Sequence, residues 1–173
     1  MSTDVNLTPT SVIVLGLLEF LGGQGTPYDL KQAVGVTVGH FWTFQHAQLY
    51  TETERLAKAG LLHEEREDGG RRRKHYSLTA KGRQALDAWR REPATDIPEL
   101  RDLGVLKLFM GADPKALGQA QAKAHEGKLQ EYHEIRKLDQ GLEPRGPWIA
   151  LDAGIQYERH MIRFWKRLAD SAA

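Results

Sequence analysis

The sequence contains no cysteine. Without thiols the chain forms no disulfide, no thiolate zinc site and no thiol-based redox switch. No apolar run approaches the ~18 residues that a membrane-spanning helix requires. The N-terminal residues MSTDVNLTP include an acid and no cation, unlike a secretory signal. We therefore predict a cytoplasmic protein that does not engage a membrane.

Motifs for catalysis and metal binding are absent as well. The seven histidines form no HExxH or HxxxH pair, the spacings that place two imidazoles on one face of a helix. The glycine-rich stretch from Gly22 to Gly25 lacks the following Gly-Lys-Ser/Thr of a phosphate-binding loop, and we interpret it as a plain loop. We predict no catalytic site, no metal site, no cofactor and no enzymatic activity.

Positive charge is concentrated in one segment. The whole chain has a formal net charge of +1, whereas residues 71–91 contain eight cations and one acid, so that this segment carries +7 and the rest of the chain −6. Such an asymmetry is typical of proteins that bind nucleic acid through one face. A solvated charged hairpin is the alternative interpretation of a basic run taken alone.

The segment before these cations has the pattern of an amphipathic helix. Residues 43–59 contain no proline or glycine, and Thr43 is a candidate N-cap. Leu49, Thr53 and Leu56 follow one another at i, i+4 and i+7, which predicts one buried face. Gly60 supplies the left-handed residue that commonly ends a helix.

A hairpin follows this helix. The extended segments LLHEERE and RKHYSL flank Asp68-Gly69-Gly70, which predicts a tight turn with its tip near Gly69. Thr79 then caps a further helix. A polar helix followed by a basic hairpin is the layout of a winged helix-turn-helix, in which the helix enters the major groove and the wing contacts the backbone.

Start signals divide the rest of the chain into helices. Thr8-Pro9 and Thr26-Pro27 each combine an N-cap with a proline at the first helical position. The proline-containing stretch 92–98 predicts a domain boundary. Beyond it, Asp113-Pro114 opens a helix of about six turns, and Trp148 begins a last amphipathic helix. We predict a mainly α fold with a small β-hairpin wing: a winged-helix domain at residues 1–92 and a helical dimerisation domain at 98–173.

The motif around the hairpin resembles the PadR family of bacterial transcriptional regulators. The resemblance is carried by Phe41, Trp42, Gln48, Leu49, Tyr50, Leu56, Gly60, Leu61, Arg71, Lys74, Tyr76, Leu78, Thr79 and Gly82. It implies a dimeric winged-helix repressor with a helical C-terminal dimerisation region that responds to small molecules. A winged-helix module that binds protein, without specific DNA binding, is the alternative.

We assign the DNA contacts to the polar helix and to the wing. Glutamine amides pair bidentately with adenine in the major groove, and wing cations contact phosphates. Tyr50 also fits a partly buried wedge, and His46 is positioned to contact a base edge or a phosphate. The predicted DNA-binding residues are Thr43, Gln45, His46, Gln48, Tyr50, Thr51, Arg55, Arg71, Arg72, Arg73 and Lys74. The predicted partner is a double-stranded DNA operator with an inverted repeat.

Apolar stripes on the two long C-terminal helices predict a homodimer, because each helix is longer than a small domain requires. The predicted dimerisation residues are Leu129, Tyr132, Ile135, Leu151, Ile155, Ile162 and Trp165. The resemblance also implies a small aromatic or hydrophobic effector. We assign its site to Trp148 and Phe109, with packing of the tryptophan in the core as the alternative.

Overall fold

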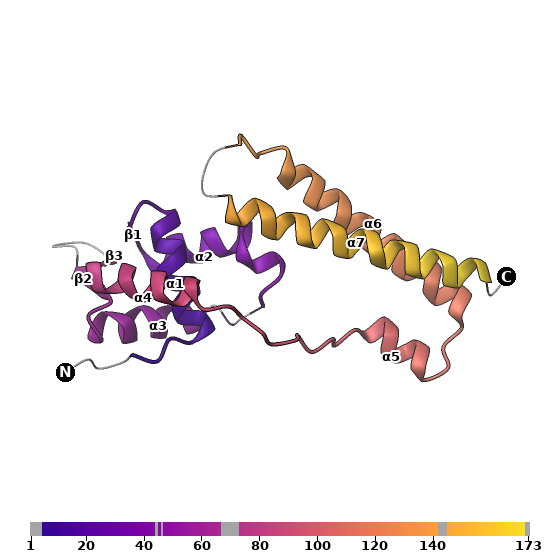
Figure 1. The fold of residues 1–173 in the computed structure, drawn as a ribbon, viewed down its shortest axis with the longest axis horizontal. Helices are drawn as coiled ribbons and strands as arrows, with labels where there is room; N and C mark the ends of the chain where they lie inside the picture. The colour runs from indigo at the N-terminus through magenta and orange to yellow at the C-terminus, as the bar shows by residue number, and fades with distance from the viewer. Residues whose placement is uncertain (1–4, 44, 46, 67–72, 142–144, 172–173) are drawn as a thin grey trace. The chain divides into compact units, whose positions relative to one another are not determined.

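The computed structural model describes residues 5–43, 45, 47–66, 73–141 and 145–171. The chain divides into two units, Met1–Asp96 and Ile97–Ala173, which are described separately below (Figure 1). The predicted hairpin tip near Gly69 lies outside the described residues.

Four helices form the body of the first unit: α1 (Pro9–Phe20), α2 (Pro27–Val36), α3 (Ala47–Lys58) and α4 (Ala80–Arg91). A short 3-10 helix, η1 (Val38–His40), follows α2. The predicted N-caps are confirmed, because the side chains of Thr8, Thr26 and Thr79 accept hydrogen bonds from backbone amides in the first turns of α1, α2 and α4. The apolar α1 is the centre of the core that α2, α3, α4 and the sheet enclose.

Three short antiparallel strands complete this unit. β1 (Gln24–Gly25), β2 (Leu62–Arg66) and β3 (Lys74–Leu78) lie in the order β1-β3-β2. The plain-loop interpretation of residues 22–25 was therefore wrong in part, because Gln24 and Gly25 pair with Ser77 and Tyr76. A two-residue strand is too short to show alternation in the sequence, and it exists through its pairing with β3.

The start of α3 also differs from the prediction. The helix begins at Ala47, so Thr43 lies four residues ahead of it and is not its N-cap. A stretch without proline or glycine permits a helix without fixing its first residue. The end was predicted correctly, since Gly60 follows the helix with a φ of +75°.

The second unit is a helical hairpin with one short helix beside it. α6 (Pro114–Arg136) packs along α7 (Gly146–Ser171), and α5 (Leu103–Phe109) contacts α6. Close approach of the two long helices depends on Gly118, because a Cβ built there would lie 2.7 Å from the backbone oxygen of Trp165. α7 starts at Gly146, two residues before the predicted Trp148.

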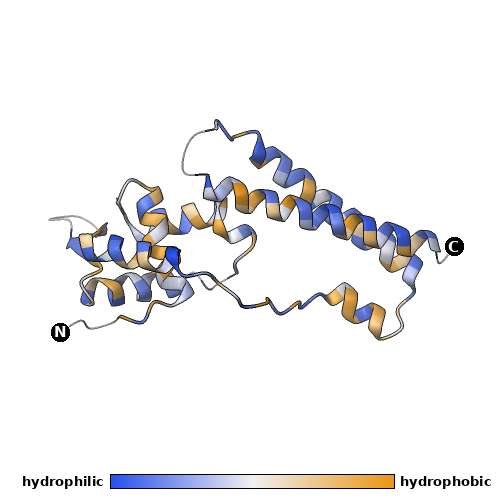
Figure 2. Cartoon of the chain, viewed as in Figure 1, coloured by the Kyte–Doolittle hydropathy of each residue, from blue (hydrophilic) through white to orange (hydrophobic). Residues whose placement is uncertain are grey.

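Large apolar side chains are exposed in the second unit. Figure 2 shows apolar residues on α5 and an apolar stripe along α7. Several large side chains of α5 remain exposed within the single chain, including Leu106 and Phe109. Among the described residues, none of the helices is both long and apolar enough to cross a membrane.

Candidate nucleic-acid interface

Helix α3 separates a fully buried face from a polar one. Leu49, Thr53 and Leu56 are each 0% exposed and hold the helix against the core. At 3.6 residues per turn, the opposite line contains Ala47, Thr51, Glu54 and Lys58, all of them exposed. The helix is therefore anchored through one face and presents a continuous row of short and charged side chains to solvent.

The structure places most of the predicted base-contacting residues at or beside this exposed face. Thr43 and Gln45 lie in the segment before α3, and Gln48 and Thr51 lie in its first two turns; all four are exposed. Tyr50 is 48% exposed, so about half of its surface is accessible in the single chain. His46 lies outside the described residues.

Arg55, in contrast, is engaged inside the unit. Its guanidinium donates to both carboxylate oxygens of Glu52, at 2.9 and 2.7 Å, to Ser11 Oγ at 2.8 Å and to the backbone oxygen of Asn6 at 3.3 Å. Ser11 in turn donates to Glu52 at 2.5 Å. The structure thus gives Arg55 a role in joining α3 to α1, where the sequence suggested contact with phosphate or flanking bases.

Glu52 is a residue that sequence reasoning missed. It is 9% exposed, and the hydrogen bonds from Arg55, together with the one from Ser11, hold the pKa of its carboxyl below the usual value despite desolvation. The available signals were the i, i+3 spacing of Glu52 and Arg55 and a serine in an otherwise apolar α1. Neither signal identifies the partner without the fold.

The base of the wing lies beside α3. Lys74, the first residue of β3, donates to Glu54 Oε1 at 2.5 Å and lies 3.6 Å from Glu64 Oε2 on β2. Arg73, just before the strand, is exposed, whereas Arg71 and Arg72 lie outside the described residues. Lys74 therefore has carboxylate partners within the protein, which its position in a basic run did not indicate.

Part of the positive charge on α4 is also used internally. Lys81 donates to the backbone oxygen of Ala59 at 2.9 Å, next to the C-terminus of α3, where a cation is favourable. Arg90 forms an ion pair with Glu19 at the end of α1. These two cations strengthen the packing of α4. The formal charge of residues 71–91 is therefore larger than the positive charge that is available to contact a ligand.

The predicted dimerisation residues fall into two groups in the second unit. Tyr132, Ile155 and Trp165 are at most 6% exposed within one chain. These three are buried within the single chain, where the apolar stripes of α6 and α7 face each other. Those that remain partly accessible are Leu129, Ile135, Leu151 and Ile162.

The two residues proposed for an effector are not brought together within the single chain. Phe109 is 83% exposed on α5, whose neighbour Leu108 packs on the cluster of Ala122, Met161 and Trp165. Trp148 is half-buried near the start of α7. Trp148 and Met161 are thirteen positions apart on α7, about 20 Å at the rise of an α-helix.

Histidine and carboxylate side chains do not gather into a metal site in the part of the chain that the structure describes. There, no group of three or more histidine, aspartate or glutamate side chains converges in a way that would hold an ion. The close contact of His125 Nδ1 with Glu158 Oε2, at 2.5 Å, joins α6 to α7 in the second unit.

A core of helices around α1, an anchored α3 with a polar outer face and a two-stranded wing define a winged helix-turn-helix unit. Residues 14–88 match the model of the transcriptional regulator PadR-like family, so the first unit resembles that family. The predicted resemblance is thereby confirmed.

One curated relative is the negative transcriptional regulator PadR of Bacillus subtilis (strain 168). It is 33% identical over 101 residues, which are 56% of this chain and 53% of that protein. The match thus spans about half the length of the relative.

Solved structures of B. subtilis PadR resemble the whole chain. The complex with operator DNA has a TM-score of 0.82 at 22% identity and covers 94% of this chain and 98% of that chain. The complex with p-coumaric acid has a TM-score of 0.76 at 19% identity and covers 96% and 98%. The predicted fold, mainly helical with a wing and a helical C-terminal region, is confirmed.

The contact network of Glu52 generates a prediction about stability and pH. Since the folded-state pKa of Glu52 is depressed, its stabilising contribution is present above the unfolded-state value of about 4.3 and is lost as the pH falls through the folded-state pKa. Glu52→Gln should lower the free energy of unfolding at pH 7 by about 1–2 kcal/mol, discounted because Arg55 is partly exposed. The measurement is chemical denaturation of both proteins between pH 7 and pH 3.

The difference between the two proteins should shrink as the pH falls below about 4. Glu65→Gln, at an exposed carboxylate of β2, is the control and should follow the wild type throughout. A difference for Glu52→Gln that stays constant over the whole pH range would contradict the assignment.

Proposed function

We propose that this protein is a sequence-specific DNA-binding transcriptional regulator that binds an inverted-repeat operator as a homodimer and represses transcription. The observation that carries the proposal is the polar outer face of α3 beside the wing, with Gln45, Gln48 and Thr51 exposed. Glutamine and threonine side chains on such a helix match base edges in the major groove. No catalytic step is assigned to the protein, and its place of action is the cytoplasm.

The relatives support this proposal. The matched B. subtilis protein is a negative transcriptional regulator, and one of its structures is a complex with operator DNA. The match to the family model spans residues 14–88, which include α3 and both strands of the wing. The exposed polar side chains of α3 and the match to the family model thus both support DNA binding by the first unit.

Dimerisation is assigned to the second unit. Large apolar side chains stay exposed there in the single chain, among them Leu103 at 65%, Met110 at 72% and Ile149 at 66%. Exposed apolar residues of this size are typical of surfaces that a second subunit covers. These residues join the partly accessible Leu129, Ile135, Leu151 and Ile162 on the accessible surface of the proposed interface.

DNA binding is tested by selection from a random duplex library. The wild-type protein should enrich an inverted repeat with half-sites about one helical turn apart. On the selected duplex, replacing Arg71, Arg72 and Arg73 by alanine should weaken binding and flatten its salt dependence by roughly 0.9 in logarithmic slope for each phosphate that is no longer neutralised. Fluorescence anisotropy at several salt concentrations measures both effects.

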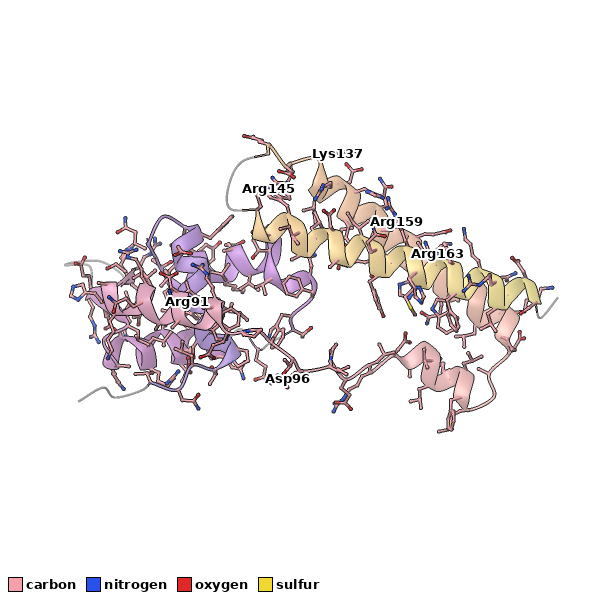
Figure 3. All side chains as sticks on the ribbon, viewed as in Figure 1. Arg91, Asp96, Lys137, Arg145, Arg159 and Arg163 are labelled. Carbon is pink, nitrogen blue, oxygen red and sulfur yellow. The ribbon has the colours of Figure 1, made fainter. Side chains whose placement is uncertain are left out.

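A matched control removes three cations from the other unit. Arg159, Arg163 and Arg167 lie on the exposed surface of α7, where Figure 3 labels the first two. Their replacement by alanine changes the net charge equally and should leave the salt slope unchanged. If the wild-type protein enriches no sequence, specific DNA binding is contradicted, and a winged-helix module that binds protein is favoured.

We further propose that a small planar aromatic compound weakens DNA binding. One structure of the B. subtilis relative is a complex with p-coumaric acid, a ligand of this type. Trp148 and Phe109 remain the proposed contacts, and since they lie apart in one protomer, a shared cavity requires residues from both subunits. Added p-coumaric acid should raise the Kd for the selected duplex in the wild type and less so in Trp148→Ala. An unchanged wild-type Kd at saturating acid would contradict the choice of compound.

A further inference from the structure

Three charged side chains from three different elements meet where the wing joins α3. Lys74 of β3 lies between Glu54 of α3 and Glu64 of β2, with its Nζ 2.5 Å from Glu54 Oε1 and 3.6 Å from Glu64 Oε2. Because two of these residues belong to the wing and one to the helix, the contacts connect the wing directly to α3. We refer to Glu54, Lys74 and Glu64 as the wing clamp.

The wing side of the clamp is held firmly. Glu64 is partly buried, and its carboxylate accepts hydrogen bonds from Tyr76 Oη at 3.0 Å and from Arg66 Nε at 3.0 Å. Tyr76 is only 1% exposed, and burial together with its bond to Glu64 raises the pKa of its hydroxyl. Glu64 therefore has a fixed position, from which it orients Lys74 toward α3.

The helix side of the clamp lies on the surface proposed to face DNA. Glu54 follows Thr51 by three residues on the exposed line of α3, and Lys58 follows Glu54 by four. A carboxylate on a surface that approaches phosphates is electrostatically unfavourable. The hydrogen bond from Lys74 keeps the pKa of the Glu54 carboxyl below its usual value, so the group stays ionised and paired.

We propose that Lys74 is a positioning residue whose bonds to Glu54 and Glu64 fix the angle between the wing and α3. With that angle fixed, helix and wing contact the DNA together, and the base of the wing need not reorient against α3 on binding. This inference rests on the proposed DNA binding. It assigns to Lys74 a role different from that of the arginines beside it, which contact phosphate.

The sign of the effect of Glu54→Gln separates the clamp from simple electrostatics. If charge alone mattered, removal of an acid near the DNA would strengthen binding. The clamp predicts weaker binding, by about fivefold, since the dimer loses two exposed ion pairs of modest strength. The logarithmic salt slope should stay unchanged because every phosphate contact is retained.

The matched control is Glu65→Gln. Glu65 adjoins Glu64 in β2 but, in the alternation of the strand, points to the other face, and its ion-pair partner is His63. This change removes the same charge from the wing and leaves the clamp intact. Binding by Glu65→Gln should be equal to that of the wild type or slightly tighter.

Two variants of Lys74 complete the test. Lys74→Arg keeps a cation between the two carboxylates and should retain wild-type affinity. Lys74→Met should weaken binding at least as much as Glu54→Gln, because it removes both ion pairs, and the double variant Glu54→Gln/Lys74→Met should bind no more weakly than Lys74→Met alone. The melting temperature of the free protein should change little in all of these variants, whereas a merely structural role would lower it.

The experiment uses the full-length protein and a duplex that the wild type has selected from a random library, with Kd measured at several salt concentrations. The wing clamp would be overturned if Glu54→Gln bound DNA as tightly as Glu65→Gln. It would also be overturned if Lys74→Met showed a flatter salt slope, which would make Lys74 a phosphate contact. If the wild type selects no sequence, the proposed function fails and the wing clamp fails with it. This result differs from the two outcomes above, which overturn the wing clamp alone.

Discussion

The surface that the first unit presents depends on how α3 is held by the core. Leu49, Thr53 and Leu56 anchor the helix through one face. The Ser11–Glu52–Arg55 network then fixes its rotation against α1 through hydrogen bonds with defined directions. Apolar contacts alone tolerate sliding, whereas a buried and paired carboxylate does not, because an unpaired charge there would be costly. The polar face of α3 is therefore set by contacts on its opposite side.

Charge in this protein has two separate uses. Four cations are bonded to groups of their own unit and hold its helices and strands together: Arg55, Lys74, Lys81 and Arg90. Arg73, just before β3, is exposed. A basic segment therefore consists of internal and external charges, and the structure distinguishes them by their partners. The net charge is only +1 because acids elsewhere in the chain offset the cations of the basic segment.

Much of the fold was predictable because its signals are local. Thr8, Thr26, Thr79 and Asp113 mark helix starts through bonds to amides two or three residues away. Contacts between distant residues were not predictable: the pairing of β1 with β3 and the bonds of Glu52 to Ser11 and of Glu54 to Lys74 span 20 residues or more. The sequence likewise showed apolar stripes on α6 and α7 without showing that Trp165 faces its own protomer.

The central claim is that α3 and the wing form one DNA-binding surface, which a homodimer presents twice. A hydroxyl-radical footprint of the wild-type protein on its selected duplex tests this claim most directly. We expect two protected segments related by a dyad, centred about 10 base pairs apart, with flanking backbone protection that disappears when Arg71, Arg72 and Arg73 are replaced by alanine. A single protected segment, or a footprint that this replacement leaves unchanged, would contradict the account.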